Sequence, residues 1–169
     1  MSRSLRVLVL ASLACACSRP APDTQAATSA AATSSAGPTT VEKFDPKADP
    51  VKDLAAAVVL AKSSGRRIIL DVGGEWCSWC HILDRFIRDH ADVSTAIARD
   101  FVWLKINFSP DNENKAFLST YPAIPGYPHL YMLSQDGDLL HSQDTALLEL
   151  GPSYDLAKVQ AFLAQWARR

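Results

Sequence analysis

The sequence predicts a single α/β domain in which helices flank a central mixed β-sheet. Short apolar, β-rich runs occur at 66–72, 101–108 and 129–133, and the segments between them space apolar residues three and four apart. An Asp136-Gly137 turn follows the third run and predicts a hairpin, so at least one strand pair is antiparallel. The 169 residues are 48% hydrophobic, which suits one domain with a single core.

The first predicted element is a helix that begins at Asp49 and Pro50. Aspartate is a good N-cap, and proline is favoured at the first helical position. Gly65 predicts the end of this helix, and Arg66–Val72 then predicts a strand buried on both faces. The apolar face expected for the helix consists of Val51, Leu54, Ala55, Val58 and Val59.

A second helix is predicted from about Cys77, after a turn that contains two glycines. A strand follows over Phe101–Phe108, and the segment 111–121 predicts a short helix. The apolar face of the second helix is Ile82, Leu83, Phe86, Ile87 and His90, and that of the short helix is Phe117, Leu118 and Tyr121.

The C-terminal part predicts a hairpin and a final helix. Pro128 stands directly before the strand His129–Leu133, a position that proline tolerates because it donates no ladder hydrogen bond there. The hairpin returns through Leu139 and Leu140, and Ser153 is the expected N-cap of the last helix. Its predicted apolar face is Leu156, Val159, Phe162, Leu163 and Trp166.

The charge balance argues against a nucleic-acid partner. The chain has 17 basic and 18 acidic residues, and they are distributed along its length. No basic face of the kind that binds phosphates is predicted from this pattern.

The N-terminus predicts export from the cytoplasm. Arg3 and Arg6 stand at the start of an apolar run over 5–16, which is shorter than the about 20 residues needed to span a bilayer and so indicates a secretion signal. The run ends in small residues followed by Cys15 and Cys17, a pattern that resembles bacterial lipoprotein cleavage sites. We expect residues 1–17 to be a lipoprotein-type signal peptide, with Cys17 (or Cys15) lipidated and the protein anchored on the periplasmic side of the membrane. Cleavage after 14–16, giving an unanchored exported protein, is the alternative.

Residues 18–40 predict a linker. Only Arg19, Asp23 and Gln25 among them are not Ala, Ser, Thr, Pro or Gly, so no core can form there. We expect a disordered tether, with the folded domain occupying 41–169.

Once the two signal cysteines are set aside, the domain contains only Cys77 and Cys80, in the stretch "GEWCSWCH". A disulfide between them closes a very short loop and restrains the unfolded chain little, so a purely stabilising role is the weaker explanation. The spacing suits a redox dithiol, but Cys-x-x-Cys-His is also the haem-attachment pattern.

The whole arrangement resembles thioredoxin. The resemblance covers Asp49–Arg169 and rests on the buried strand "IILDV", the stretch "EWCSWC" at the start of a helix, and a later proline that leads into an antiparallel hairpin. It includes Asp71 six residues before Cys77, Trp76 directly before that cysteine, and Pro128. Within the family the chain looks most similar to exported bacterial thioredoxin-like proteins, including the C-terminal domain of the transmembrane disulfide-interchange protein. The resemblance implies a thioredoxin fold with an extra N-terminal helix.

The resemblance and the helix position together imply catalytic roles for three residues. At the first turn of a helix, Cys77 meets unpaired N–H groups and the positive end of the helix dipole, both of which favour the thiolate nucleophile. Cys80 would resolve the mixed disulfide formed with a substrate. Asp71, desolvated under the helix, would take the Cys80 proton directly or through a water molecule.

The resemblance also implies a substrate surface. A cis bond between Tyr127 and Pro128 would present backbone polar groups to an extended substrate beside Cys77, although the sequence does not fix the isomer. Trp76 would add apolar contact area.

Three residues are predicted to tune the redox potential. Ser78 and Trp79 replace the Gly-Pro pair usual in thioredoxin, so the direction of the net reaction stays open, and His81 would add positive charge near the thiols.

Haem and metal binding are the alternative chemistries. For a c-type haem, His81 would be the proximal ligand, with Met132, His90, His129 or His141 as the second. Against this, the buried strand, the acid and the proline would all be coincidences. The two cysteines and the following histidine also lack the fourth ligand of a closed zinc site, so no resident metal is predicted, but copper handling by the same thiols stays open.

The sequence therefore predicts a thiol-disulfide oxidoreductase of the cell envelope that needs no cofactor beyond its own Cys77–Cys80 disulfide. Its expected partners are thiols and disulfides of envelope proteins and a membrane redox partner that recharges the dithiol.

Overall fold

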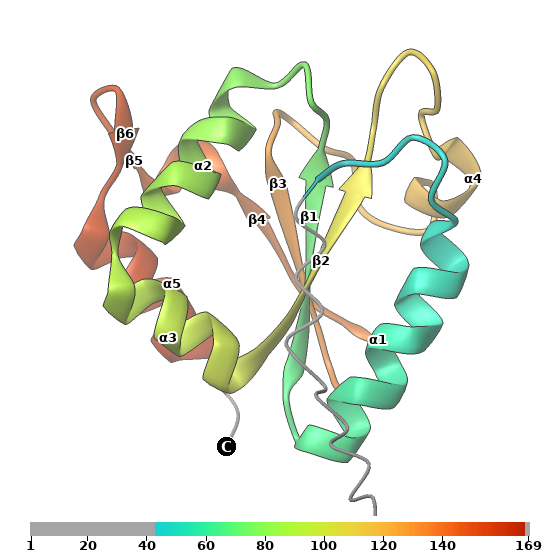
Figure 1. Ribbon diagram of the computed structural model, residues 1–169, viewed down its shortest axis with the longest axis horizontal. Helices are drawn as coiled ribbons and strands as arrows, with labels where there is room; N and C mark the ends of the chain where they lie inside the picture. The colour runs from blue at the N-terminus through green and yellow to red at the C-terminus, as the bar shows by residue number, and fades with distance from the viewer. Residues whose placement is uncertain (1–42, 168–169) are drawn as a thin grey trace, which may run out of the picture. The chain divides into compact units, whose positions relative to one another are not determined.

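The computed structural model describes residues 43–167, and the predicted signal peptide, lipidation sites and linker lie outside these residues. Figure 1 shows the domain as a sheet with helices on both faces. The elements in chain order are α1 (Pro50–Ser64), β1 (Arg67–Gly73), α2 (Ser78–Asp89), α3 (Ala91–Asp100), β2 (Phe101–Asn107), α4 (Lys115–Leu118), β3 (His129–Leu133), β4 (Leu139–Asp144), the 3-10 helix η1 (Thr145–Leu148), β5 (Glu149–Leu150), β6 (Ser153–Tyr154) and α5 (Leu156–Trp166).

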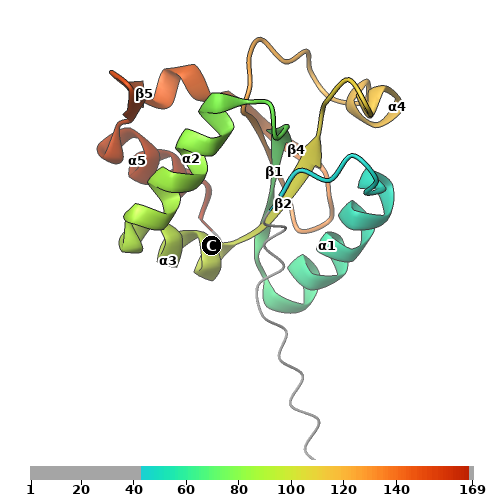
Figure 2. The ribbon, with the colours of Figure 1, turned by 45° about the horizontal axis from the view of Figure 1, so that its top comes forward.

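The central sheet is mixed, as predicted. Its strand order is β2-β1-β3-β4, with β1 and β2 parallel and the other neighbours antiparallel. Helices α2, α3 and α5 cover one face, and α1 covers the other (Figures 1 and 2). β1 therefore lies in the middle of the sheet, and every residue of β1 after Arg67 is buried.

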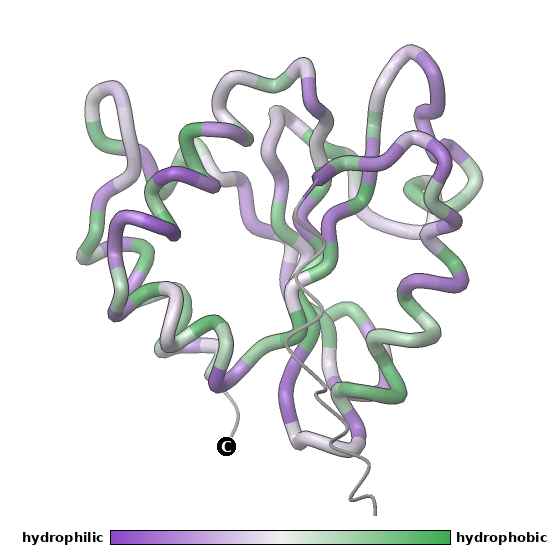
Figure 3. Tube along the Cα trace, viewed as in Figure 1, coloured by the Kyte–Doolittle hydropathy of each residue, from purple (hydrophilic) through white to green (hydrophobic). Residues whose placement is uncertain are grey.

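Each face of the sheet has its own apolar core. One cluster joins β1, β2 and β3 to α2, α3 and α5, and includes Ile69, Trp103 and Met132. The other joins the same strands to α1 and includes Leu70 and Tyr131. Hydrophilic and hydrophobic residues alternate along α2, as Figure 3 shows. This amphipathic pattern indicates which side of α2 meets the sheet, whereas α1 is mostly apolar.

The predicted apolar face of α1 is wrong for three of its five residues, which are exposed. Val51 and Val59 are 63% and 70% exposed, and Ala55 is exposed too, whereas Ala57 and Ala61 are buried. Leu54 and Val58, the remaining members of the predicted face, are half-buried and pack on the core. Most residues of α1 are apolar, so two overlapping apolar stripes could face the sheet. In the structure the stripe with the small side chains Ala57 and Ala61 faces it. The ends of α1 agree with prediction, with Asp49 as N-cap and Gly65 as a left-handed C-cap.

The segment between α2 and β2 contains a helix that was not predicted. α2 ends at Asp89 and α3 starts at Ala91, so only the shared cap residue His90 separates them, without a glycine or proline to mark the boundary. The short helix expected over 111–121 is reduced to the four residues of α4. The side chains expected to face inward there, Phe117, Leu118 and Tyr121, are half-buried against the core.

The predicted cap of the last helix is also wrong. Ser153 belongs to β6, which pairs with β5 in a small hairpin, and the N-cap of α5 is Asp155. The Asp155 carboxylate accepts hydrogen bonds from the backbone N–H groups of Ala157 (2.9 Å) and Lys158 (3.2 Å). Ser153 and Asp155 are both good capping residues, but Ser153 is paired in the β5–β6 hairpin, so the helix begins after Asp155.

Alanine at the true cap is expected to destabilise the domain. Asp155→Ala removes the acceptor of two helix N–H groups and should lower the free energy of unfolding by about 1 kcal/mol. The matched control Ser153→Ala should change it by less than about 0.5 kcal/mol. Urea denaturation measures both, and equal losses would contradict the assignment of Asp155 as the cap.

None of the helices between residues 43 and 167 combines the length and the apolar character that a bilayer span requires.

Candidate active site

Cys77 and Cys80 form a disulfide at the start of α2, with their Cα atoms 5.2 Å apart. Cys77 is the N-cap residue, and its Sγ accepts a hydrogen bond from the Cys80 N–H at 3.1 Å. The sulfur therefore receives one of the N–H groups that a helix N-terminus leaves unpaired. This contact would stabilise a thiolate on Cys77 after reduction.

Both sulfur-bearing residues are enclosed, Cys77 at 3% and Cys80 at 1% exposure. Gly73, at the end of β1, makes room for the inner sulfur, since a Cβ there would lie 2.4 Å from Cys80 Sγ. Gly73 does not have a positive φ, so space and not backbone freedom requires this glycine. Gly74 gives similar room to the indole of Trp76, which a Cβ would approach to 2.4 Å.

Asp71 lies in β1 beneath this helix and is 1% exposed. One oxygen, Oδ2, accepts hydrogen bonds from Lys105 Nζ (3.0 Å) and from Trp103 Nε1 (3.2 Å), both on β2. The other oxygen, Oδ1, has no hydrogen-bond partner among the described residues. A buried carboxylate with one oxygen unoccupied has an acceptor available for a proton.

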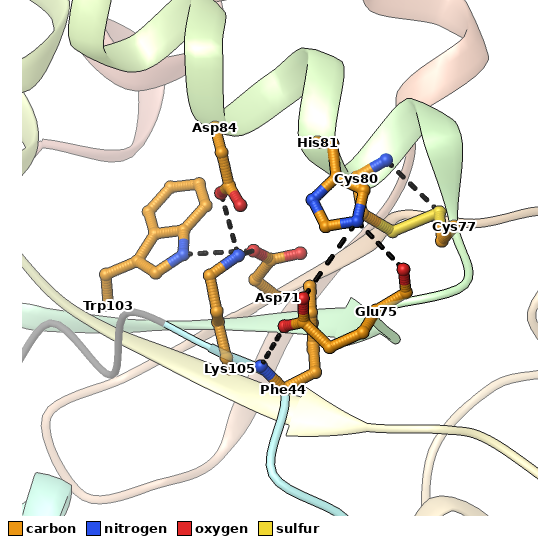
Figure 4. Close-up of polar contacts among 9 residues, drawn as sticks. All are labelled: Phe44, Asp71, Glu75, Cys77, Cys80, His81, Asp84, Trp103 and Lys105. Carbon is orange, nitrogen blue, oxygen red and sulfur yellow. Dashed lines mark hydrogen bonds and ion pairs between the residues drawn. A yellow bond between two sulfur atoms is a disulfide. The ribbon is translucent and has the colours of Figure 1, made fainter.

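Lys105 links Asp71 to a second carboxylate. Its Nζ donates to Asp84 Oδ1 at 2.7 Å, and Asp84 lies on α2 one turn after Cys80. Figure 4 shows Trp103, Lys105 and Asp84 around Asp71, with the disulfide alongside. The side chain of Lys105 is only 5% exposed, so the three charges interact in a largely dry environment.

Burial raises the pKa of Asp71 above its ordinary value, because the charged form loses its hydration. The Lys105 ammonium and the Trp103 indole oppose this shift without cancelling it, while Asp84 adds to it. For Lys105, burial is the largest single effect and lowers the pKa, but Asp71 and Asp84 together outweigh it and raise the pKa. The site thus holds a carboxyl group that is more basic than usual beside a lysine that stays charged.

A residue ahead of α1 closes this region. Phe44 is 2% exposed and shares an apolar cluster with Cys77 and Cys80. Its ring lies over the Lys105 ammonium, with Nζ 4.0 Å from the ring centroid. The Phe44 N–H donates to Glu75 Oε1 at 2.9 Å, as drawn in Figure 4.

The outer side of the disulfide is bordered by aromatic side chains. Trp76 is 54% exposed, and its indole N–H donates to the backbone oxygen of Phe108 at 2.6 Å. Tyr127 meets Trp76 edge to face, with ring centroids 5.5 Å apart, and stacks on Phe108 at 4.8 Å. The Tyr127–Pro128 bond is cis, the isomer that the resemblance implies.

The residues predicted to tune the potential fall into different environments. Ser78 is exposed at the first position of α2. Trp79 is half-buried and meets Tyr154 of β6 edge to face at 5.6 Å, so packing accounts for much of this side chain. His81 Nε2 contacts the backbone oxygen of Glu75 at 2.9 Å and lies 4.0 Å from its carboxylate.

Sequence reasoning missed Lys105, Asp84 and Phe44, although two of them carried a signal. Lys105 is the one charge inside the apolar run "FVWLKINF", and a buried charge requires a partner. Asp84 stands four residues after Cys80 and therefore on the same helix face. Phe44 carried no comparable signal, because the contacts that place it in the site, with Gly73, Glu75 and Lys105, are all with residues distant in sequence.

A cluster of three or more His, Cys, Asp or Glu side chains suited to hold a metal ion is not found among residues 43–167.

Comparison with known families identifies a match over most of this domain. The thioredoxin-like family model matches residues 49–134, which include both cysteines, Asp71 and Pro128. Among curated relatives, the thiol:disulfide interchange protein DsbD of Pseudomonas fluorescens is 28% identical over 92 residues. These residues are 54% of this chain but only 15% of that relative.

Solved structures share the fold. A disulphide isomerase from Xylella fastidiosa aligns with a TM-score of 0.63 and 22% identity over 72% of this chain and 94% of its own. The C-terminal domain of DsbD from Neisseria meningitidis, in its reduced form, aligns with a TM-score of 0.53 and 22% identity over 70% and 97%. At this level of identity the likeness establishes the fold.

Proposed function

Because the chain belongs to the thioredoxin-like family, we propose that it is a thiol-disulfide oxidoreductase acting on protein disulfides or dithiols of the cell envelope. The observation that carries this proposal is the Cys77–Cys80 disulfide at the N-terminus of α2, directly above the buried Asp71. A nucleophile, a resolving thiol and a base are then assembled on one strand-helix unit.

In the reductive direction the reaction begins with the reduced pair. The Cys77 thiolate attacks one sulfur of a substrate disulfide, a Cys77–substrate disulfide forms, and the other substrate sulfur leaves as a thiolate. The Cys80 N–H that already points at Cys77 Sγ favours the thiolate form of the attacking group.

The second step returns the protein to the state seen here. Asp71 takes the proton of the Cys80 thiol, directly or through a water molecule, and the Cys80 thiolate attacks Cys77 Sγ. The Cys77–Cys80 bond forms, and the remaining substrate sulfur leaves as a thiolate that takes a proton from solvent. The substrate gains two electrons and the pair loses two, so an external dithiol must reduce the pair before the next cycle.

The aromatic border is the proposed substrate surface. Trp76 and Tyr127 offer apolar area beside Cys77, and the cis Tyr127–Pro128 bond presents backbone groups to an extended chain. Both sulfurs lie between this border, Phe44 and the end of β1, and Cys80 is only 1% exposed, so a porphyrin bonded to both sulfurs would displace the side chains around them. The geometry therefore favours the dithiol over the haem alternative.

The proposed location is the periplasmic side of a bacterial membrane. The support is the signal-like segment 1–17 with its two cysteines, followed by the polar linker 18–40. A lipid on Cys17 (or Cys15) would hold the domain on its tether near a membrane redox partner, and DsbD is the kind of protein named among the relatives.

The reduction potential of the pair tests the proposal. The full chain carrying Cys15→Ser and Cys17→Ser should behave as a two-electron couple in glutathione or dithiothreitol buffers. A value near about −270 mV would make it a reductase supplied with electrons across the membrane, and one near about −120 mV an oxidant. A haem absorption band with no titratable dithiol would overturn the proposal.

Loss of the base is expected to slow resolution without affecting the first attack. Asp71→Asn should lower the rate of Cys80 attack by about 100-fold, because the amide cannot accept the thiol proton. Stopped-flow measurement of the two thiolates released from an aryl disulfide separates the two steps. Asp136→Asn, which alters an exposed carboxylate paired with Lys62, serves as the control. An unchanged second phase would remove Asp71 from the mechanism.

A further inference from the structure

Phe44 has a position that its sequence context does not explain. It stands six positions before Pro50, the first residue of α1, yet its side chain is as buried as the core of the sheet. It packs with Cys77 and Cys80, away from the two large apolar clusters. An aromatic side chain is thus committed to the dithiol and not to general core packing.

The ring separates two components of the proton-transfer machinery from solvent. A Cβ on Gly73 would lie 3.1 Å from Phe44 Cζ and 2.4 Å from Cys80 Sγ, so the ring edge and the inner sulfur both border the same glycine. The ring face covers the Lys105 ammonium at 4.0 Å. Phe44 therefore lies where water would otherwise reach Lys105 and, behind it, Asp71.

Two contacts hold the segment in place. The Glu75 carboxylate accepts the Phe44 N–H at 2.9 Å, and Glu75 stands two residues before Cys77. The Asn112 side chain donates to the backbone oxygen of Pro46 at 2.9 Å. The turn that carries the nucleophile thus also fixes the ring.

We propose that Phe44 is a positioning residue for proton transfer at Cys80, because it excludes water from the Asp71–Lys105 pair and is itself held by Glu75. This inference rests on the proposed function and deepens it. Phe44 brings no charge of its own and is only 2% exposed, so it acts through the groups that it covers.

The groups around Asp71 determine how exclusion of water by Phe44 affects its ionisation. Lys105 approaches from β2, Asp84 and Cys80 from α2, and the hydroxyl-bearing Tyr154 of β6 interacts with it electrostatically. Leu130, its neighbour on β3, is apolar. Admission of water would screen these charges and stabilise the carboxylate, so Asp71 would become a weaker base that ionises at lower pH.

Reaction with the aryl disulfide DTNB tests this effect in the full chain carrying Cys15→Ser and Cys17→Ser. Attack by reduced Cys77 releases one aryl thiolate, and attack by Cys80 on the resulting mixed disulfide releases the second. At high DTNB concentration the second phase is first-order, so stopped-flow traces give its rate between acidic and alkaline pH. The variants are Phe44→Ala, Phe44→Leu, Glu75→Ala and Glu75→Gln. The control Phe117→Ala removes a partly buried ring from the α1 side of the sheet.

The expected result is a change in the pH profile of the second phase only. Phe44→Ala should move the midpoint of its acidic limb down by about one pH unit, and Glu75→Ala in the same direction by less. Phe44→Leu and Glu75→Gln should keep the original midpoint, because the first retains an apolar cover and the second retains an acceptor for the Phe44 N–H. The rate of the first phase should change by less than about twofold in every variant.

A purely structural role predicts something different. If Phe44→Ala lowers the melting temperature as Phe117→Ala does but leaves the midpoint in place, the proposal is wrong. Should Phe44→Ala fail to fold, an unchanged midpoint in Glu75→Ala overturns it. The reduction potential of the pair is scored separately, so a protein without a two-electron dithiol couple would refute the function, whereas an unchanged midpoint in a protein that has one would refute only this inference.

Discussion

The Cys77→Ser variant is expected to lose disulfide exchange altogether, by about three orders of magnitude or more. Cys77 is the N-cap of α2, and its sulfur accepts the Cys80 N–H, whereas Cys80 is packed against Gly73. Only Cys77 is therefore placed to begin the reaction. Turnover of a protein disulfide such as insulin, measured in the full chain with Cys15→Ser and Cys17→Ser, is the direct readout.

The Cys80→Ser variant should attack normally and then stop. Without a resolving thiol, the Cys77–substrate disulfide persists and is seen as a covalent adduct that dithiothreitol releases. The Cys15→Ser and Cys17→Ser background alone is the control and should retain full exchange. Adducts on Cys77→Ser in place of Cys80→Ser would reverse the assigned roles, and exchange by Cys77→Ser at the original rate would refute them.

The second large effect is expected on stability. Lys105→Met should lower the free energy of unfolding at neutral pH by about 3–5 kcal/mol, because it leaves Asp71 and Asp84 buried or half-buried without their shared cation. The double variant Asp71→Asn with Lys105→Met should recover a large part of this loss, since it removes the unpaired buried charge. Denaturant unfolding followed by circular dichroism measures both.

The pH dependence of this loss follows from the pKa of Asp71. Burial already raises this pKa, and removal of Lys105 raises it further. A raised folded-state pKa means that stability is retained below the unfolded value and lost as the pH rises through the folded value. The deficit of Lys105→Met should therefore be small near pH 4 and grow toward neutrality.

An exposed lysine provides the matched control. Lys62 Nζ lies 3.0 Å from Asp136 Oδ1, the same separation as in the buried Lys105–Asp71 pair. The side chains of Lys62 and Asp136 are, however, both more than half exposed. Lys62→Met should change the free energy of unfolding by less than about 1 kcal/mol, with little pH dependence. Equal losses in the two variants would show that burial does not amplify the central pair.

The parts of the site that were predicted from sequence are those that local rules determine. Cys77 and Cys80 are three apart at a helix start, and Asp71 lies in the C-terminal half of a recognisable buried strand. Pro128 directly precedes β3, whose bounds agree with prediction. The central strands are short apolar, β-rich runs separated by turn and helix signals, which is why the mixed sheet could be predicted.

The parts that were missed depend on contacts between distant segments. Phe44 belongs to the site because Gly73 leaves room for its ring and Glu75 binds its N–H, and neither condition is visible in the residues around it. The sequence of α1 permits two apolar stripes, and only the distance to the sheet selects the one with Ala57 and Ala61 inward. Local pattern identifies elements well but leaves such choices to tertiary packing.

The pairing of Asp71 with Lys105 also constrains how the chain folds. The two residues are direct partners on the parallel strands β1 and β2, and both point to the α2 face of the sheet. A shift of β2 by a single residue would turn Lys105 to the opposite face, where the buried cluster is apolar, and would leave Asp71 without its cation. Each misaligned strand pairing therefore costs several kcal/mol, while most of the surrounding aliphatic side chains would tolerate exchange with one another. The buried charges beside the dithiol thus also favour the native alignment of β1 with β2.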